Sequence, residues 1–388
     1  MTLSDRIKEQ SEQSETPEFS PRTEFDGNTG FIQTGPLAAP PTDYNDLLGQ
    51  FGYDPAQVYI VGHPRISKWQ QRARDKDTGE FETVWLSAFK FALAARGFAV
   101  DLPGLYAENA RLKPVRPVKP KHAEATVVVC WADIQVGKVD HLGGLTELLQ
   151  RLDEKRRDLD VYLRKASFDR IVVADVGDII EGFSNFAAQH RTNSLSMMDQ
   201  VDVAAVEFWK TIRLCAKFAE VDVLSIPSNH CAWRRDGKML AGKPTDDWGL
   251  HISKRLERLN EEAELPVAFH RPNDWEETLQ FDIRGTRLGL AHGHQVNNPD
   301  QIKNWWAKMT HSGVLNVDIL VTGHFHFASL RPSGRDHATG KSRWHIQAPT
   351  LDNGSAWVRN KFGEDGDPAL AVFRINSSGF DLSSFALL

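Results

Sequence analysis

The chain has 388 residues, of which 41% are hydrophobic, and its formal net charge is −6 at pH 7. This length allows two or three domains with a sizeable core, and no stretch approaches the roughly 18 apolar residues that a membrane span requires. The acidic balance argues mildly against a dedicated DNA-binding module, which is usually basic, although a local patch with bound cations can serve instead.

The cysteines and the N-terminus bear on the cellular compartment. Three cysteines, Cys130, Cys215 and Cys231, are widely spaced and form no CxxC pair. A disulfide framework and a zinc–thiolate site are therefore not expected. The first residues are polar, with no apolar region typical of a secretory signal. We expect a cytoplasmic protein that does not associate with a membrane.

The first third of the chain divides into a tail, a small unit and a linker. Residues 1–42 are rich in Ser, Glu, Gln, Pro, Thr and Gly, which predicts a disordered tail. Residues 43–110 are predicted to form a small α+β unit of unassigned role. It would contain a helix near Tyr44–Phe51, a β-like run Val58–Val61 and an apolar helix-like stretch Trp85–Arg96.

A linker over residues 111–124 carries proline at every third or fourth position together with several basic residues. Such a composition favours extended polyproline II and prevents a helix. The basic residues could contact a polyanion, or the segment could simply be a solvated spacer.

Strands and helices alternate from residue 125 to residue 388. The first half predicts three buried strands and three helices: Thr126–Trp131, Leu145–Lys165, Ile171–Ala174, Met197–Ala219, Val221–Ile226 and Asp246–Glu264. The second half is β-rich, with strands predicted at Thr278–Ile283, Arg287–Ala291, Ile319–Thr322, Trp344–Gln347 and Ala371–Ile375. This order indicates an α/β fold in which two packed sheets have helices on their outer faces.

Polar residues of a particular kind follow five of these strands. They are Asp133-Ile-Gln135, Gly177-Asp178, Ser228-Asn229-His230, His292-Gly-His294 and Gly323-His324-Phe-His326. Ligands of α/β sheets bind beyond the carboxyl ends of the strands, and residues i and i+2 of an extended chain point to the same side. Carboxylate, amide oxygen and imidazole suit Mn²⁺, Mg²⁺, Fe or Zn²⁺. The pattern predicts a divalent-metal site at one edge of the sheets.

The ordered series D-x-Q, G-D, N-H, H and G-H-x-H, spread over about Ala125–Leu388, resembles the calcineurin-like metallophosphoesterase superfamily. The resemblance implies a four-layer β-sandwich of two mixed sheets flanked by helices. It also implies two divalent metal ions, most readily manganese, with Mg, Fe or Zn as alternatives. A hydroxide that bridges the two ions would be the nucleophile.

The resemblance also assigns residues to these roles. Asp133, Gln135, Asp178 and His326 would hold the first ion. Asp178, Asn229, His292 and His324 would hold the second, so that Asp178 bridges the two. His230 would be the catalytic residue, which steadies the phosphate or protonates the leaving oxygen.

This chain departs from the family pattern in three places. Gln135 replaces the usual histidine, and an amide oxygen is a weaker and harder ligand, so we expect a looser first site that prefers Mn²⁺ or Mg²⁺ to Zn²⁺. Cys231 stands where a carboxylate usually follows the N-H pair. Spacing does not decide between His292 and His294. Because similar proteins use the first histidine, we expect His292 to bind metal and His294 to orient substrate.

Other candidate substrate contacts rest on position alone. Asn185 and His190 lie in the loop after Asp178, and Arg234 and Arg235 closely follow His230. Arginines there could hold a phosphate through bidentate contacts. A polar surface loop and an ordinary solvated charge cluster explain these residues equally well.

The segment Ala132–Lys138 resembles the first motif of SbcD-like DNA-repair nucleases, and the whole chain resembles related phage-encoded phosphoesterases. The resemblance implies a Mn²⁺-dependent DNA phosphodiesterase and a possible homodimer. That branch often carries a histidine at the position of Glu181, which is a departure here. Two alternatives stay open, a phosphatase or phosphodiesterase for nucleotides or other small molecules, and a non-catalytic scaffold that keeps the fold.

Overall fold

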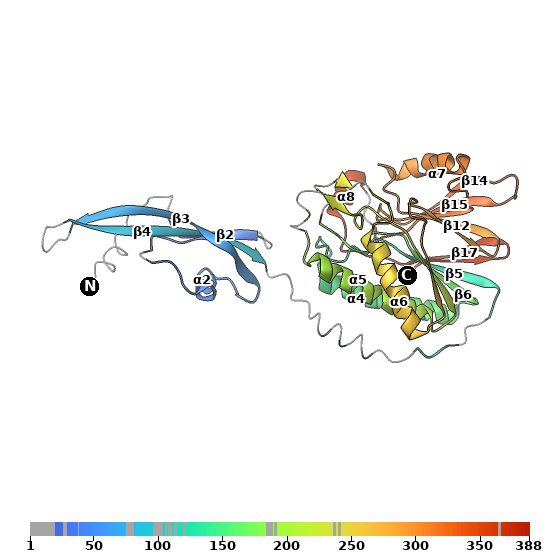
Figure 1. Ribbon diagram of the computed structural model, residues 1–388, viewed down its shortest axis with the longest axis horizontal. Helices are drawn as coiled ribbons and strands as arrows, with labels where there is room; N and C mark the ends of the chain where they lie inside the picture. The colour runs from blue at the N-terminus through green and yellow to red at the C-terminus, as the bar shows by residue number, and fades with distance from the viewer. Residues whose placement is uncertain are drawn as a thin grey trace. The chain divides into compact units, whose positions relative to one another are not determined.

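The computed structural model describes residues 20–25, 29–37, 39–74, 81–95, 104, 107, 111, 115–118, 122–183, 189, 192–235, 238–239, 242–363 and 366–388. The chain forms two compact units, Met1–Ala99 (the smaller unit) and Val100–Leu388 (the larger unit) (Figure 1). The division falls before the boundary expected at residue 110.

The smaller unit is a four-stranded antiparallel sheet with one short helix. Its strands lie in the order β1-β2-β4-β3. They are β1 (Arg22–Phe25), β2 (Thr29–Gln33), β3 (Val58–Arg74) and β4 (Phe81–Ala95), and the helix is α2 (Tyr44–Gln50). The expected helix begins where predicted, because the carboxylate of Asp43 accepts hydrogen bonds from two free N–H groups of its first turn.

Two expectations for this part of the chain are wrong. Residues 22–25 and 29–33 of the expected disordered tail form β1 and β2, because Ile32 is fully buried against Leu48, Val58 and Leu93. The expected helix from residue 85 is instead part of β4, which pairs with β3 along its length. Short apolar runs suit a strand as well as a helix, and here tertiary pairing decides.

The larger unit contains two mixed sheets. The six-stranded sheet has the order β10-β7-β6-β5-β16-β17, with its first four strands parallel, and the five-stranded sheet has the order β11-β12-β13-β15-β14. The first consists of β5 (Ala125–Trp131), β6 (Arg170–Asp175), β7 (Glu220–Ser225), β10 (Val267–His270), β16 (Ala371–Asn376) and β17 (Gly379–Leu387). The second consists of β11 (Leu279–Ile283), β12 (Thr286–Ala291), β13 (Ile319–Thr322), β14 (Ser329–Arg335) and β15 (Ser342–Gln347).

Helices cover the outer faces of both sheets (Figure 1). They are α4 (Leu145–Lys165), α5 (Met197–Cys215), α6 (Trp248–Ala263) and α7 (Ile302–His311). A short helix, α8 (Ala356–Phe362), follows β15. A short pair of strands, β8 (Arg234–Arg235) and β9 (Lys238–Met239), and the 3₁₀ turn η2 (Pro299–Gln301) complete the described elements. Within the described residues, no helix has the length and apolar character needed to cross a membrane.

Alternation along the strands explains the layers, because successive side chains of a strand point to opposite faces. On β5, Val128 faces the second sheet and packs with Leu290 and Val321. Its neighbour Val127 faces the helices α4, α5 and α6 instead, and Trp306 of α7 covers the far side of the second sheet. The expected fold, two mixed sheets flanked by helices, is therefore confirmed.

Val118 of the expected linker packs against the rest of the larger unit. The N–H of Val118 donates a hydrogen bond to the carbonyl of Lys217, with 2.5 Å between nitrogen and oxygen, and its side chain packs at the edge of the core under the helices. The proline-rich segment is therefore not a purely solvated spacer at this residue.

Phe373→Ala tests the contact between the two sheets. Phe373 of β16 is fully buried between them and meets Phe380 edge-on at 5.3 Å between ring centroids. Removing the ring leaves a cavity, so we expect the free energy of unfolding to fall by about 3–5 kcal/mol in urea denaturation. As a control, Trp275→Ala removes an exposed ring and should change stability by less than about 0.5 kcal/mol. Equal losses in both variants would contradict the assigned core.

Candidate metal centre

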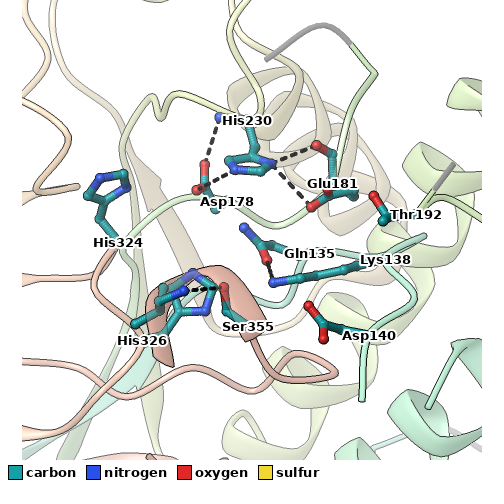
Figure 2. Close-up of a pocket in the computed structure, with 11 residues that line it drawn as sticks. Gln135, Lys138, Asp140, Asp178, Glu181, Thr192, His230, His324, His326 and Ser355 are labelled. Atoms are coloured by element: carbon teal, nitrogen blue, oxygen red, sulfur yellow. Dashed lines mark hydrogen bonds and ion pairs between the residues drawn. The ribbon is translucent and has the colours of Figure 1, made fainter. Parts of the chain in front are cut away.

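A cavity of about 300 Å³ opens where strands of both sheets end (Figure 2). Residues that follow β5, β6, β7, β13 and β15 all contribute to its wall. The lining consists of Gln135, Lys138, Asp140, Asp178, Glu181, Thr192, His230, His324, His326, Ser355 and Val358. Of the predicted site residues, this lining contains Gln135, Asp178, His230, His324 and His326.

Five predicted site residues have the left-handed backbone conformation that most side chains avoid. The φ angles are 50° at Asp133, 45° at Gln135, 52° at Asp178, 74° at His324 and 66° at His326. Such a residue costs on the order of 1–3 kcal/mol and persists only where its surroundings enforce it. Only two other described non-glycine residues share this conformation. The strain therefore concentrates where strands turn their last side chains toward the cavity.

Asp178 lies at the centre of the best-formed ligand group. Its own N–H donates to the hydroxyl of Ser228 (2.8 Å), and its Oδ1 accepts from the N–H of His230 (2.9 Å). One ligand atom from each of Asp178, His292 and His324 lies within 4.8 Å of the others. Three such donors at this spacing are able to share one metal ion.

The proton arrangement at His292 fits a cation in that position. Its Nδ1 lies 2.8 Å from the carbonyl of Val176, so Nδ1 carries the hydrogen and Nε2 presents a lone pair. That Nε2 is 2.9 Å from Oδ2 of Asp178, and neither buried atom has a hydrogen-bond partner of good geometry among the described residues. Two acceptors facing each other need a positive charge between them.

The pKa values of His292 and Asp178 also indicate that a positive charge belongs between them. Burial would lower the pKa of His292, but Asp178 outweighs burial and raises it to about 9. Burial alone would raise the pKa of Asp178, yet His292 and His230 hold it well below its usual value. A proton on His292 or a divalent ion satisfies the same electrostatic demand. The donor set therefore fits the metal that the sequence predicts.

A second ligand group surrounds Asp133. Both carboxylate oxygens accept from the N–H of His324 (3.1 and 3.0 Å), and Oδ1 lies 3.6 Å from Nε2 of His326. Burial raises the pKa of Asp133, against the opposing influence of His326 and His292. The amide oxygen of Gln135, implied as a ligand here, accepts a hydrogen bond from the ammonium group of Lys138 at 2.6 Å.

His230 has a fixed orientation at the cavity wall (Figure 2). Its Nδ1 lies 2.7 Å from the carbonyl of Glu181 and 3.2 Å from the carboxylate of the same residue, so Nδ1–H donates there. Its Nε2 is 3.9 Å from Oδ2 of Asp178. Burial opposes protonation, but Asp178 and Glu181 raise the pKa of His230 to about 9. The imidazole is thus largely protonated at neutral pH.

The remaining predicted residues take different places. Asn229 lies between Ser228 and His230, with its Oδ1 buried. His294 lies outside the 4.8 Å group, with Nε2 3.6 Å from Glu277 and its ring 5.5 Å from that of His292. Arg234 and Arg235 form β8, but their side chains are outside the description. Asn185 and His190 lie outside the described residues.

Six residues of the lining were not among the predicted site residues, namely Lys138, Asp140, Glu181, Thr192, Ser355 and Val358. Asp352, also absent from the prediction, is bonded to the ammonium group of Lys138 at 2.5 Å. Asp352 follows β15 just as the predicted ligands follow their strands, so the strand-end signal could have found it. Asp247 caps α6 and also accepts the N–H of Ser228, which fixes the loop that carries Asn229.

Comparison with known proteins gives distant similarity. No family model matches the chain. Over 190 residues it is 24% identical to the SPbeta prophage-derived uncharacterized protein YonJ of Bacillus subtilis strain 168. That match covers 48% of this chain and 45% of YonJ, so the chain spans less than half the length of this relative.

Two solved structures resemble the chain over about two thirds of its length. Vps29 from Entamoeba histolytica, complexed with Zn²⁺, is 12% identical with a TM-score of 0.29, and the match covers 68% of this chain and 97% of that one. A metallophosphoesterase from Sphaerobacter thermophilus is 13% identical with a TM-score of 0.29, and the match covers 68% of this chain and 88% of that one.

Gly323→Ala tests the position of the Asp133 carboxylate. A Cβ atom at Gly323 would lie 2.5 Å from Oδ2 of Asp133, so the carboxylate must move. Asp133 accepts the N–H of His324, so this shift also displaces a proposed ligand, and we expect Mn²⁺ affinity, measured by titration calorimetry, to fall about tenfold or more while the fold is kept. Gly242→Ala is the matched control, because a Cβ there meets nothing within 4 Å. An unchanged affinity in Gly323→Ala would show that the position of Asp133 does not influence metal binding.

Proposed function

We propose that this chain is a metal-dependent phosphoesterase and that its substrate is the phosphodiester backbone of DNA. The buried group of Asp178, His292 and His324 carries the proposal. A carboxylate and two imidazoles are gathered at strand ends, and the contact between Nε2 of His292 and Oδ2 of Asp178 is costly unless a proton or a metal ion lies there. A structural role in packing does not account for this arrangement.

Asp178, Asn229, His292 and His324 would hold the metal, and Asp133 and His326 lie beside them. When bound, a divalent ion lowers the pKa of water and neutralises phosphate charge. His230 supplies the other half of the chemistry. With Nδ1–H held by Glu181, its Nε2 side lies toward Asp178 and the cavity, in position to protonate a leaving oxygen.

DNA as the substrate rests on two supporting observations. The Ala132–Lys138 segment resembles the first motif of SbcD-like nucleases, and the relative with 24% identity derives from a prophage. A nucleotide or another small phosphoester is the second candidate, and the cavity volume favours it. About 300 Å³ is at the lower end of ligand-binding pockets and suits a small phosphoester.

The decisive experiment incubates the purified full chain and Mn²⁺ with end-labelled double- and single-stranded DNA, and separately with bis-p-nitrophenyl phosphate. We expect cleavage of both kinds of substrate, and its loss in Asp178→Asn, because the amide cannot supply the carboxylate charge that the ion requires. Hydrolysis of the small ester with intact DNA would favour the nucleotide-type enzyme. No hydrolysis with Mn²⁺, Mg²⁺, Fe²⁺ or Zn²⁺ would favour the non-catalytic scaffold.

The role of His230 has its own test. His230→Gln should lower kcat about 10²–10⁴-fold, because no acid then protonates the leaving oxygen. Glu181→Gln removes one of the carboxylates that raise the pKa of His230, so the protonated form is lost at lower pH. We expect the alkaline limb of the kcat–pH profile to move toward lower pH in Glu181→Gln.

Metal content measured on the same samples is the control for both variants. It should equal that of the unmodified chain, since neither side chain belongs to the ligand group. If the alkaline limb does not move in Glu181→Gln, Glu181 does not raise the pKa of His230, even if the overall rate declines.

A further inference from the structure

Lys138 occupies a place where the sequence leads one to expect a metal ion. Its Nζ lies 2.6 Å from Oε1 of Gln135 and 2.5 Å from Oδ2 of Asp352. The residue is 8% exposed and Asp352 is fully buried. The buried ammonium group is bonded to two oxygens, and one of them belongs to the implied metal ligand Gln135. The protein therefore supplies its own cation at this position.

Backbone contacts hold both partners of this ion pair. The N–H of Lys138 donates to the carbonyl of Gln135 at 3.0 Å, and the carbonyl of Lys138 accepts from the side chain of Asn353 at 2.7 Å. On the other side, Oδ1 of Asp352 accepts from the N–H of Gly354 at 2.9 Å. The pair is therefore part of the turn structure, unlike a flexible surface lysine that happens to lie close by.

The ammonium also alters what is left for a metal in the group around Asp133. Oδ2 of Asp352 lies 3.2 Å from Nδ1 of His326 as well as next to Lys138, so one carboxylate serves both. The oxygen of Gln135 is engaged by a positive charge that repels a nearby divalent ion. Asp133, His326 and the shared Asp178 are left as donors.

Resting on the proposed phosphoesterase function, we propose that the centre binds one divalent ion tightly, at Asp178, His292 and His324, and that the ammonium of Lys138 replaces the second ion. Lys138 lines the cavity, so its charge also faces a bound phosphate. Lysine suits this role, because its ammonium is a compact point charge. Of the two cations expected at this centre, one is then a metal ion and the other is the ammonium group of Lys138.

The test counts metal ions per chain. The full chain is loaded with Mn²⁺, desalted and analysed by elemental mass spectrometry, and Mn²⁺ binding is titrated by equilibrium dialysis. We expect about one tightly bound ion per chain. In Lys138→Met the buried Asp352 loses its partner and calls for another cation. The second Mn²⁺ should then bind at least about tenfold more tightly, which raises the count toward two.

Two variants serve as controls. Lys138→Arg keeps the positive charge, so the count should stay at about one. Lys210→Met removes a lysine of similar burial, 13% exposed in its side chain against 10%, which pairs with Glu207 on α5 away from the centre. It should leave the count unchanged. Circular dichroism establishes that each variant is folded.

Electron paramagnetic resonance of the unmodified chain with two equivalents of Mn²⁺ gives an answer that does not depend on any variant. Isolated Mn²⁺ spectra support the proposal, and an exchange-coupled pair overturns it. Two tight ions in the unmodified chain, or a count of one that persists in folded Lys138→Met, also overturn it while the phosphoesterase proposal stands. Failure to bind any ion would overturn both.

Discussion

Burial of carboxylates at the ends of strands is the constraint on which the rest of the larger unit depends. Asp133, Asp178 and Asp352 are each no more than 1% exposed. An ionised carboxylate taken out of water is very costly unless charges and hydrogen bonds surround it. Backbone N–H groups, imidazoles and one ammonium are arranged around these three side chains, and the left-handed turns serve that arrangement. The two sheets act as a rigid frame that keeps the charges together.

The buried carboxylates form two groups, and the negative charge of each group is balanced in a different way. Around Asp178, two facing atoms need a proton or a metal ion between them. Around Asp352, the chain supplies its own cation in Lys138. Glu181 is a fourth buried carboxylate of the site, and it acts through His230 by fixing one nitrogen of the imidazole. The proposed metal ligands and the proposed acid His230 thereby lie side by side, which is what the proposed hydrolysis of a phosphoester would require.

Much of the larger unit could be predicted because its signals are local. Buried strands read as apolar runs, α4 and α6 show helical periodicity, and polar residues directly after strands mark the site. The role of Lys138 could not be predicted because it depends on Asp352, which lies more than 200 positions away in the chain. The smaller unit was misread for a related reason. The strand character of residues 85–95 arises from pairing with β3, and a short apolar stretch does not reveal its partner.

The proposed ligands lie far apart in the sequence, and this affects the stability of the folded protein. Asp178, His292 and His324 come together only after both sheets have formed, so an unfolded chain does not present the group. An ion that binds only the folded protein adds to its stability by mass action, by about 2.7 kcal/mol at one hundred times the dissociation constant. The lifetime of this protein under heat or dilution would then follow the supply of metal in its surroundings, and a chelator would act on it as a mild denaturant.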